Sequence, residues 1–396
     1  MPLIEDTARA FMPYPDAPLP HAAAGPLAGL SFAVKDLFDV AGYPTGCGQP
    51  LKLAQSGLRS STAPTVQRLL DAGARFVGKT LTDELAFSMN GQNAHFGSPL
   101  NGAAPERIAG GSSSGSASAV SNRLCDFALG TDTGGSVRAP ASHNGLIGLR
   151  PTHGRISLQG AMDLAPSLDT CGWFSRDGAT YARVADVLLG DDPAPLPAAV
   201  RLLLPPDLWA LLQPEVLAAL APARAAVEAL LGAARPAPPV TDSLDAMYWH
   251  FRHLQGREAW QVHGAFIERH QPPLGPGVAQ RFAWSRSVTA EQYAAALEFR
   301  QAFRAQLAQL LGSDGVLLLP TMPDIAPRTD ADEASLEDYR NRAIRLLSTS
   351  GLSGFPQISL PLASRLGAPL GLSLLGPPGS DRSLVHLAGL LLPAAR

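Results

Sequence analysis

The chain has 396 residues, of which 46% are hydrophobic and 16% are charged, and its formal net charge is −3. The low charged fraction and the high apolar fraction exclude a disordered chain and predict a large core. The balance of 31 basic against 34 acidic residues excludes the electrostatic footprint of a nucleic-acid-binding or anionic-membrane-binding protein.

The N-terminal sequence and the cysteines bear on the cellular location and on possible disulfide or metal sites. The first residues lack the positive flank and apolar stretch of a signal peptide, and no apolar run approaches the length of a membrane span. The 3 cysteines cannot all pair and form no C-x-x-C motif. We therefore expect a cytoplasmic protein with no nucleic-acid or membrane partner, no metal site and no cofactor.

The N-terminal part of the chain alternates between strand and helix patterns. Residues 1–28 are rich in proline and alanine and predict an irregular arm. The apolar run 30–34 predicts a buried strand that ends at Lys35. Residues 63–73 carry apolar positions at helical spacing, and 75–79 predict a second short strand. This strand–helix–strand order predicts an α/β fold with some parallel pairing.

Two glycine- and serine-rich loops lie in the next segment. Residues 110–116 open a small-residue helix that continues to about residue 124. A strand is predicted at 125–129, followed by the loop 130–136 and a helical turn from residue 137. Both loops therefore precede helices, which is where backbone N–H groups are left without partners.

The C-terminal half shows clearer helices and a final pair of strands. A helix is predicted near 215–231, and the strongest helix pattern covers 289–311, with Thr289 as its N-cap. Strands are predicted at 314–321, 357–361 and 370–376. The chain shows no internal repeat and no long linker, so we expect one domain over residues 1–396.

The loop before Ser136 suits chemistry on a carbonyl group. Thr133, Gly134 and Gly135 precede this serine at a strand-to-helix junction. Glycines allow consecutive N–H groups to point into one concavity, and a helix start adds a positive dipole end. These features favour an oxyanion and an activated serine. A tight turn with a capping serine is the simpler interpretation, and the loop alone does not separate the two.

The 110–116 loop also admits several interpretations. It lacks the Gly-Lys-Ser/Thr ending of a phosphate-binding loop. Residues 111–115 fit G-x-S-x-G, but no buried apolar strand precedes them, as a hydrolase nucleophile elbow requires. A third interpretation makes a serine of this loop a relay between a base and Ser136.

Lysine is scarce in this chain. Only Lys35, Lys52 and Lys79 are lysines, whereas the other basic residues are arginines. A lysine retained against that bias suits a position where the amine must lose its proton, which arginine does not do in proteins.

These residues together resemble the amidase signature family. The resemblance rests on Lys35 after an apolar strand and on the runs 110–117 and 130–141. Further matches lie at 149–155, 167–172, 319–321 and 369–372. Within the family, the runs 36–43, 46–48 and 172–177 are similar to those of bacterial small-amide amidases close to indole-3-acetamide amidase. The resemblance spans roughly residues 27–390 and implies a mixed twisted β-sheet flanked by helices on both faces.

The resemblance also implies roles for individual residues. Ser136 would be the nucleophile, Ser112 the bridging serine that follows a cis peptide bond, and Lys35 the base. The N–H groups of the oxyanion hole would come from Thr133, Gly134, Gly135 and Ser136. Burial beside an apolar strand would lower the pKa of Lys35 from its usual value of ~10.4. The chain would then hydrolyse an amide through an acyl-enzyme without a cofactor.

The substrate is less defined by the sequence. We expect Met89, Trp173 and Phe174 to line an aromatic acyl pocket, which favours an aryl-acetamide-type amide. Asp132 and Arg138 either support the nucleophile loop or bind substrate, and Arg138 in the pocket would favour a ureido or carboxylated amide. A glutaminase subunit of an amidotransferase and a non-catalytic scaffold are further alternatives. The sequence does not decide between a monomer and a homodimer.

Overall fold

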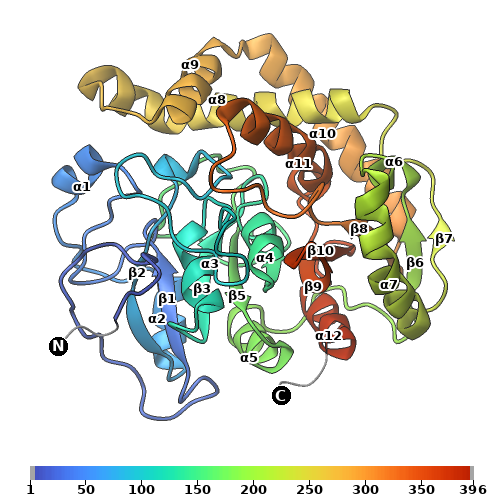
Figure 1. Ribbon diagram of the computed structural model, residues 1–396, viewed down its shortest axis with the longest axis horizontal. Coiled ribbons are helices and arrows are strands. Elements are labelled where there is room, and N and C mark those ends of the chain that lie inside the picture. The colour runs from blue at the N-terminus through green and yellow to red at the C-terminus, as the bar shows by residue number, and fades with distance from the viewer. Residues whose placement is uncertain (1–4, 393–396) are drawn as a thin grey trace.

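A ten-stranded mixed β-sheet runs through the computed structural model, which describes residues 5–392 (Figure 1). The strand order across the sheet is β2-β1-β3-β5-β4-β9-β10-β8-β6-β7. The strands are β1 (Ser31–Lys35), β2 (Arg75–Thr80), β3 (Phe127–Thr131), β4 (Ile147–Arg150), β5 (Cys171–Ser175), β6 (Arg201–Leu204), β7 (Arg235–Pro236), β8 (Gly315–Pro320), β9 (Gln357–Arg365) and β10 (Ala368–Leu375).

The sheet combines parallel and antiparallel pairs. β1 pairs in parallel with both β2 and β3, which confirms the pairing predicted from the strand–helix–strand order. β3 and β4 pair antiparallel with β5, and β9 pairs antiparallel with β10. Strand β3 lies two residues further along the chain than predicted. The predicted final strand pair is confirmed as the β9–β10 hairpin.

Helices of very different lengths surround the sheet. They are α1 (Pro50–Ser56), α2 (Pro64–Asp71), the short 3-10 helix η1 (Glu84–Ala86), α3 (Ser114–Ser121), α4 (Arg138–Asn144), α5 (Gly178–Leu188), α6 (Pro206–Trp209), α7 (Pro214–Leu231), α8 (Leu244–His270), α9 (Pro276–Ser287), α10 (Ala290–Leu311), α11 (Glu333–Ser353) and α12 (Asp381–Leu391). α8, α9, α10 and α11 pack on one another at one end of the molecule (Figure 1).

Both faces of the sheet are covered, as the resemblance implied. Successive side chains of a strand point to opposite faces. Phe32 and Val34 of β1 belong to the larger core, which also contains residues of α2 and α5. Ala33 between them belongs to a smaller cluster that contains residues of α3 and α4. The fold is therefore a mixed sheet between two layers of helices.

The predicted cap of α10 is confirmed in detail. The Thr289 hydroxyl accepts a hydrogen bond from the N–H of Gln292 at 3.2 Å, and the Gln292 side chain accepts from the Thr289 N–H at 2.9 Å. This reciprocal pair is a capping box. The predicted helix near 215–231 is likewise present as α7. By contrast, α8 and α11 were not expected from the sequence, although both carry residues that line the cavity beside Ser136.

Residues 5–30 contain neither a helix nor an extended strand. Phe11 forms an isolated antiparallel bridge with Thr80 of β2, and the Tyr14 hydroxyl donates to Asp36 at 2.7 Å. The segment is thus held against β2, the edge strand next to β1. Within the described range 5–392, no helix combines the length and the apolar character needed to cross a membrane.

Candidate active site

Lys35 ends strand β1 inside the protein. Its side chain is fully buried, and its Nζ donates hydrogen bonds to Ser112 Oγ and Thr131 Oγ1, each at 2.8 Å. Thr131 ends the neighbouring parallel strand β3, so the pairing of β1 with β3 brings the two side chains together. Both acceptors are neutral hydroxyl groups. The hydrogen bonds of Lys35 therefore do not depend on a positive charge.

The environment of Lys35 favours the neutral amine. Burial lowers the pKa of Lys35 from 10.5 to about 7, and the carboxylates of Asp83, Asp169 and Asp132 oppose this shift only in part. Burial disfavours the charged form of a lysine because the ammonium group loses its hydration. Near neutral pH, a large fraction of Lys35 is consequently free to accept a proton.

The backbone of Ser112 is fixed by hydrogen bonds to residues that follow strand β2. The Gly111–Ser112 peptide bond is cis. The Ser112 carbonyl accepts hydrogen bonds from the Asp83 N–H at 3.1 Å and the Thr82 hydroxyl at 3.0 Å. A Cβ at Gly111 would lie only 2.2 Å from the Asp83 carboxylate, so this position requires glycine. The fixed backbone directs the Ser112 hydroxyl toward Lys35.

Asp132 organises the loop that carries Ser136. Its carboxylate accepts hydrogen bonds from the N–H groups of Gly135 at 2.8 Å and of Val137 and Arg138 at 3.2 Å. The Arg138 guanidinium donates to both of its oxygens, at 2.9 and 3.0 Å. Although burial opposes it, Arg138 and the nearby Arg150 hold the pKa of Asp132 well below its usual range. A permanently charged carboxylate therefore fixes the loop.

Arg138 supports this loop and does not face the pocket. Its side chain is fully buried, and besides Asp132 it donates to the Leu347 carbonyl at 2.9 Å and to the Gln357 side chain at 2.6 Å. Of the two roles considered for Asp132 and Arg138, the geometry favours loop support. A substrate carboxylate at Arg138 would have to displace these partners.

Three N–H groups of the loop are free to bind an oxyanion. The N–H groups of Thr133, Gly134 and Ser136 have no acceptor among residues 5–392. The expectation for Gly135 is wrong, because its N–H already donates to Asp132. Gly135 is needed for another reason: its φ is +116°, and a Cβ there would lie 2.3 Å from Leu347. The predicted oxyanion hole therefore retains three of its four N–H donors.

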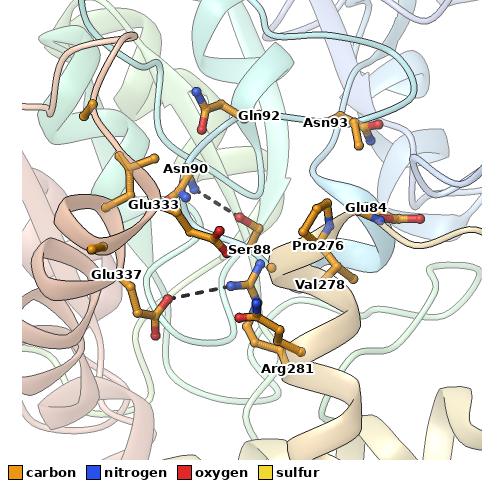
Figure 2. Close-up of a pocket in the computed structure, with 17 residues that line it drawn as sticks. Glu84, Ser88, Asn90, Gln92, Asn93, Pro276, Val278, Arg281, Glu333 and Glu337 are labelled. Carbon is orange, nitrogen blue, oxygen red and sulfur yellow. Dashed lines mark hydrogen bonds and ion pairs between the residues drawn. The ribbon is translucent and has the colours of Figure 1, made fainter.

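Ser136 opens onto a small cavity. It is 6% exposed and lines a narrow cavity together with Gly134 and with side chains from three other parts of the chain. Those side chains include Phe87, Met89, Phe251, Gln255, Arg340 and Ile344. A larger groove shares Ser88 with this cavity and extends past Glu84, Arg281 and Glu337 (Figure 2). The groove and the cavity therefore meet at Ser88.

Of the three residues predicted to line an aromatic pocket, the structure places one beside Ser136. Met89 lines the cavity beside Ser136. Trp173 and Phe174 do not, because both are fully buried in strand β5. Trp173 stacks on Tyr181 with ring centroids 4.7 Å apart, and Phe174 packs in the small cluster beneath α3 and α4. The aromatic walls of the cavity are instead Phe87 and Phe251.

The sequence analysis missed several residues of the site. Thr131 lies within the recognised run 130–141, and its place at the end of β3 could have suggested a contact with Lys35. Asp83 follows strand β2 at the same edge of the sheet. Phe251 and Arg340 lie on α8 and α11, and no local motif marks them.

Comparison with known proteins identifies the family and the fold. Residues 4–385 match the family model described as Amidase. The chain is 39% identical to Amidase 1 of Arabidopsis thaliana over 92% of this chain and 93% of that protein. It is 35% identical to the 2-amino-5-chloromuconic acid deaminase of Comamonas testosteroni over 92% of this chain and 81% of the other. A crystal structure of an amidase superposes with a TM-score of 0.84 at 35% identity, covering 93% of this chain and 85% of that one.

The support role of Arg138 predicts a loss of stability when it is replaced. Arg138→Met leaves the buried acceptors at Leu347 and Gln357 unpaired, and we expect the free energy of unfolding to fall by about 3–5 kcal/mol. Urea denaturation measures this change. The control is Arg328→Met, because Arg328 and its partner Asp330 are both exposed; it should cost within about 1 kcal/mol. Unchanged stability of Arg138→Met, with a raised KM for carboxylated amides, would restore the substrate-binding role.

Proposed function

The chain belongs to the amidase family, and on that premise we propose that it is a serine amidohydrolase that converts a small carboxylic amide and water to an acid and ammonia. In this proposal Ser136 is the nucleophile, Ser112 relays protons, and Lys35 is the base. The observation that carries the proposal is the buried Lys35 amine, 2.8 Å from the Ser112 hydroxyl. Such an amine can act as a base without a histidine or a metal ion.

The first half of the reaction forms an acyl-enzyme. Ser136 Oγ attacks the carbonyl carbon of the amide while its proton passes through the Ser112 hydroxyl to the neutral Lys35 amine. The developing negative charge on the carbonyl oxygen is stabilised by the free N–H groups at Thr133, Gly134 and Ser136. Preorganised donors of this kind are usually the largest single contribution to catalysis of acyl transfer.

The second half releases both products. The protonated Lys35 returns its proton through Ser112 to the departing nitrogen, so ammonia leaves as the C–N bond breaks. Water then attacks the ester of Ser136, and the same relay takes the water proton and later restores the Ser136 hydroxyl. Lys35 must therefore gain and lose a proton twice in each cycle, which a pKa of about 7 favours at neutral pH.

The cavity supports a small acyl group of apolar or aryl character. Phe87, Met89 and Phe251 line it, so the side chains next to Ser136 are largely apolar. An aryl-acetamide-type amide fits this proposal, although Phe87 and Phe251 take the place that the sequence analysis gave to Trp173 and Phe174. Aromatic walls favour a flat apolar acyl group through stacking and burial of its surface.

The assignment of the nucleophile predicts the result of one substitution. Ser136→Ala should reduce kcat by several orders of magnitude, given the roughly 10⁶-fold loss known for nucleophile removal in another serine hydrolase. Ammonia release from phenylacetamide measures the loss. Labelling with a fluorophosphonate followed by peptide mapping should modify residue 136 in the native protein and nothing at that position in the variant. Retention of most of the activity by Ser136→Ala would exclude this mechanism.

The base assignment predicts a pH profile with a definite sign. Protonated Lys35 cannot accept the proton of Ser136, so kcat/KM should rise with pH and level off above about 7. On the acidic side it should fall roughly tenfold per pH unit. Lys35→Arg should be inactive throughout, because a guanidinium group stays charged. A profile that is flat between about pH 5 and 9, or one that falls as the pH rises to neutrality, would contradict a lysine base.

A further inference from the structure

One charged side chain borders the cavity that contains Ser136. Of the described residues that line this cavity, Arg340 alone carries a charge. Arg340 lies on α11 and is only 4% exposed. The acyl-enzyme chemistry proposed above uses neither this guanidinium group nor any positive charge at this wall of the cavity. A buried charge whose donors are not all paired is a candidate for binding an anion.

The hydrogen bonds of Arg340 leave much of its guanidinium group available. Its Nη1 donates to Glu337 at 3.1 Å, and Glu337 is itself 43% exposed. Within residues 5–392, no acceptor is in hydrogen-bonding contact with its Nε or Nη2. Arg138, by contrast, has all its side-chain nitrogen atoms engaged. The two arginines therefore differ: one supports the loop and the other keeps free donors.

The surroundings of Arg340 carry an excess of positive charge. Arg281 from α9 contacts the same Glu337 at 3.9 Å, as Figure 2 shows, and Glu333 also faces Arg281. Burial, together with Arg281 and Arg252, lowers the pKa of Arg340 to about 9. The group remains protonated at neutral pH, but its charge is poorly compensated. An anion in the cavity would relieve this shortage of negative charge.

We propose that Arg340 binds a carboxylate at the far end of the acyl group, so that the substrates are small amides whose apolar or aryl acyl part also carries an acidic group. This inference rests on the proposed function. Arg340 and Ser136 line the same cavity, so a molecule acylating Ser136 there lies beside the guanidinium group. Phe87 and Phe251 would contact the apolar middle of that molecule. The free guanidinium edge offers the paired N–H groups that match a carboxylate.

A matched pair of amides tests the proposal. Phenylacetamide and 4-carboxyphenylacetamide share the scissile amide and the ring and differ in the carboxylate; hexanamide and adipamic acid form an aliphatic pair. For the wild-type protein we expect kcat/KM to be higher for the acidic member of at least one pair by roughly 10- to 100-fold, the usual range for a hydrogen-bonded charged group.

Substitutions identify the residue responsible. Arg340→Met should abolish the preference for the acidic amide, mainly through a raised KM. Arg340→Lys should retain part of it, and it serves as the test if the methionine variant does not fold. Glu337→Gln, which removes the competing carboxylate, should increase the preference. The control is Arg342→Met on the same helix, whose partner Asp338 is 68% exposed; it should keep the wild-type ratio.

The outcomes separate this inference from the proposed function. Hydrolysis of the neutral amides without any preference for the acidic ones would overturn the role of Arg340 and leave the serine mechanism standing. An equal fall of kcat/KM for both members of a pair in Arg340→Met and Arg340→Lys would also overturn it, because that result indicates a structural residue. Absence of any amide hydrolysis in the wild-type protein would overturn the proposed function itself.

Discussion

The burial of one amine between two hydroxyl groups is the constraint on which the site depends. Lys35 lies at the end of β1, and the parallel pairing of β1 with β3 supplies Thr131, while the loop before α3 supplies Ser112. Lys79 on β2 is equally buried, yet it forms an ion pair with Asp36 at 2.7 Å. Two buried lysines on adjacent strands therefore have different surroundings, because Lys79 pairs with a carboxylate whereas both hydrogen-bond acceptors of Lys35 are neutral hydroxyl groups. The sheet creates the conditions for a neutral amine at that position.

A second buried charge fixes the other half of the site. Asp132 holds the N–H groups of Gly135 and Val137 and is itself held by Arg138 and Arg150. This arrangement turns one N–H away from the cavity and leaves those at Thr133, Gly134 and Ser136 free. The site thus combines a charged aspartate that shapes the cradle with a lysine that can lose its charge. Burial disfavours the charged form of both groups, and their different partners decide that Asp132 stays charged whereas Lys35 can become neutral.

The sequence indicated the parts of the fold that carry local signals. The strand ending at Lys35, the cap at Thr289 and the β9–β10 hairpin follow from short patterns. Helix α8 packs against α9, α10 and α11. It buries polar residues such as Gln255 and Glu258 as well as the apolar Phe251. Because its buried positions are not all apolar, no apolar stripe in the sequence predicted this helix. The prediction that Trp173 and Phe174 line the pocket was wrong because it, too, rested on residue type without the packing. Residue type identified Trp173 and Phe174 as large aromatic residues, but helices cover both faces of β5 and leave no cavity beside them.

The most direct test is a measurement of the Lys35 pKa itself. The chain has only three lysines, so NMR of protein labelled at the lysine Cε gives three side-chain signals, and Lys35→Met identifies the one that belongs to Lys35. The titration is best done in the folded Ser136→Ala variant, which has the same buried amine without turnover. The account predicts a Lys35 signal that titrates near pH 7. A Lys35 signal that stays protonated up to about pH 10, the usual range for lysine, would contradict it.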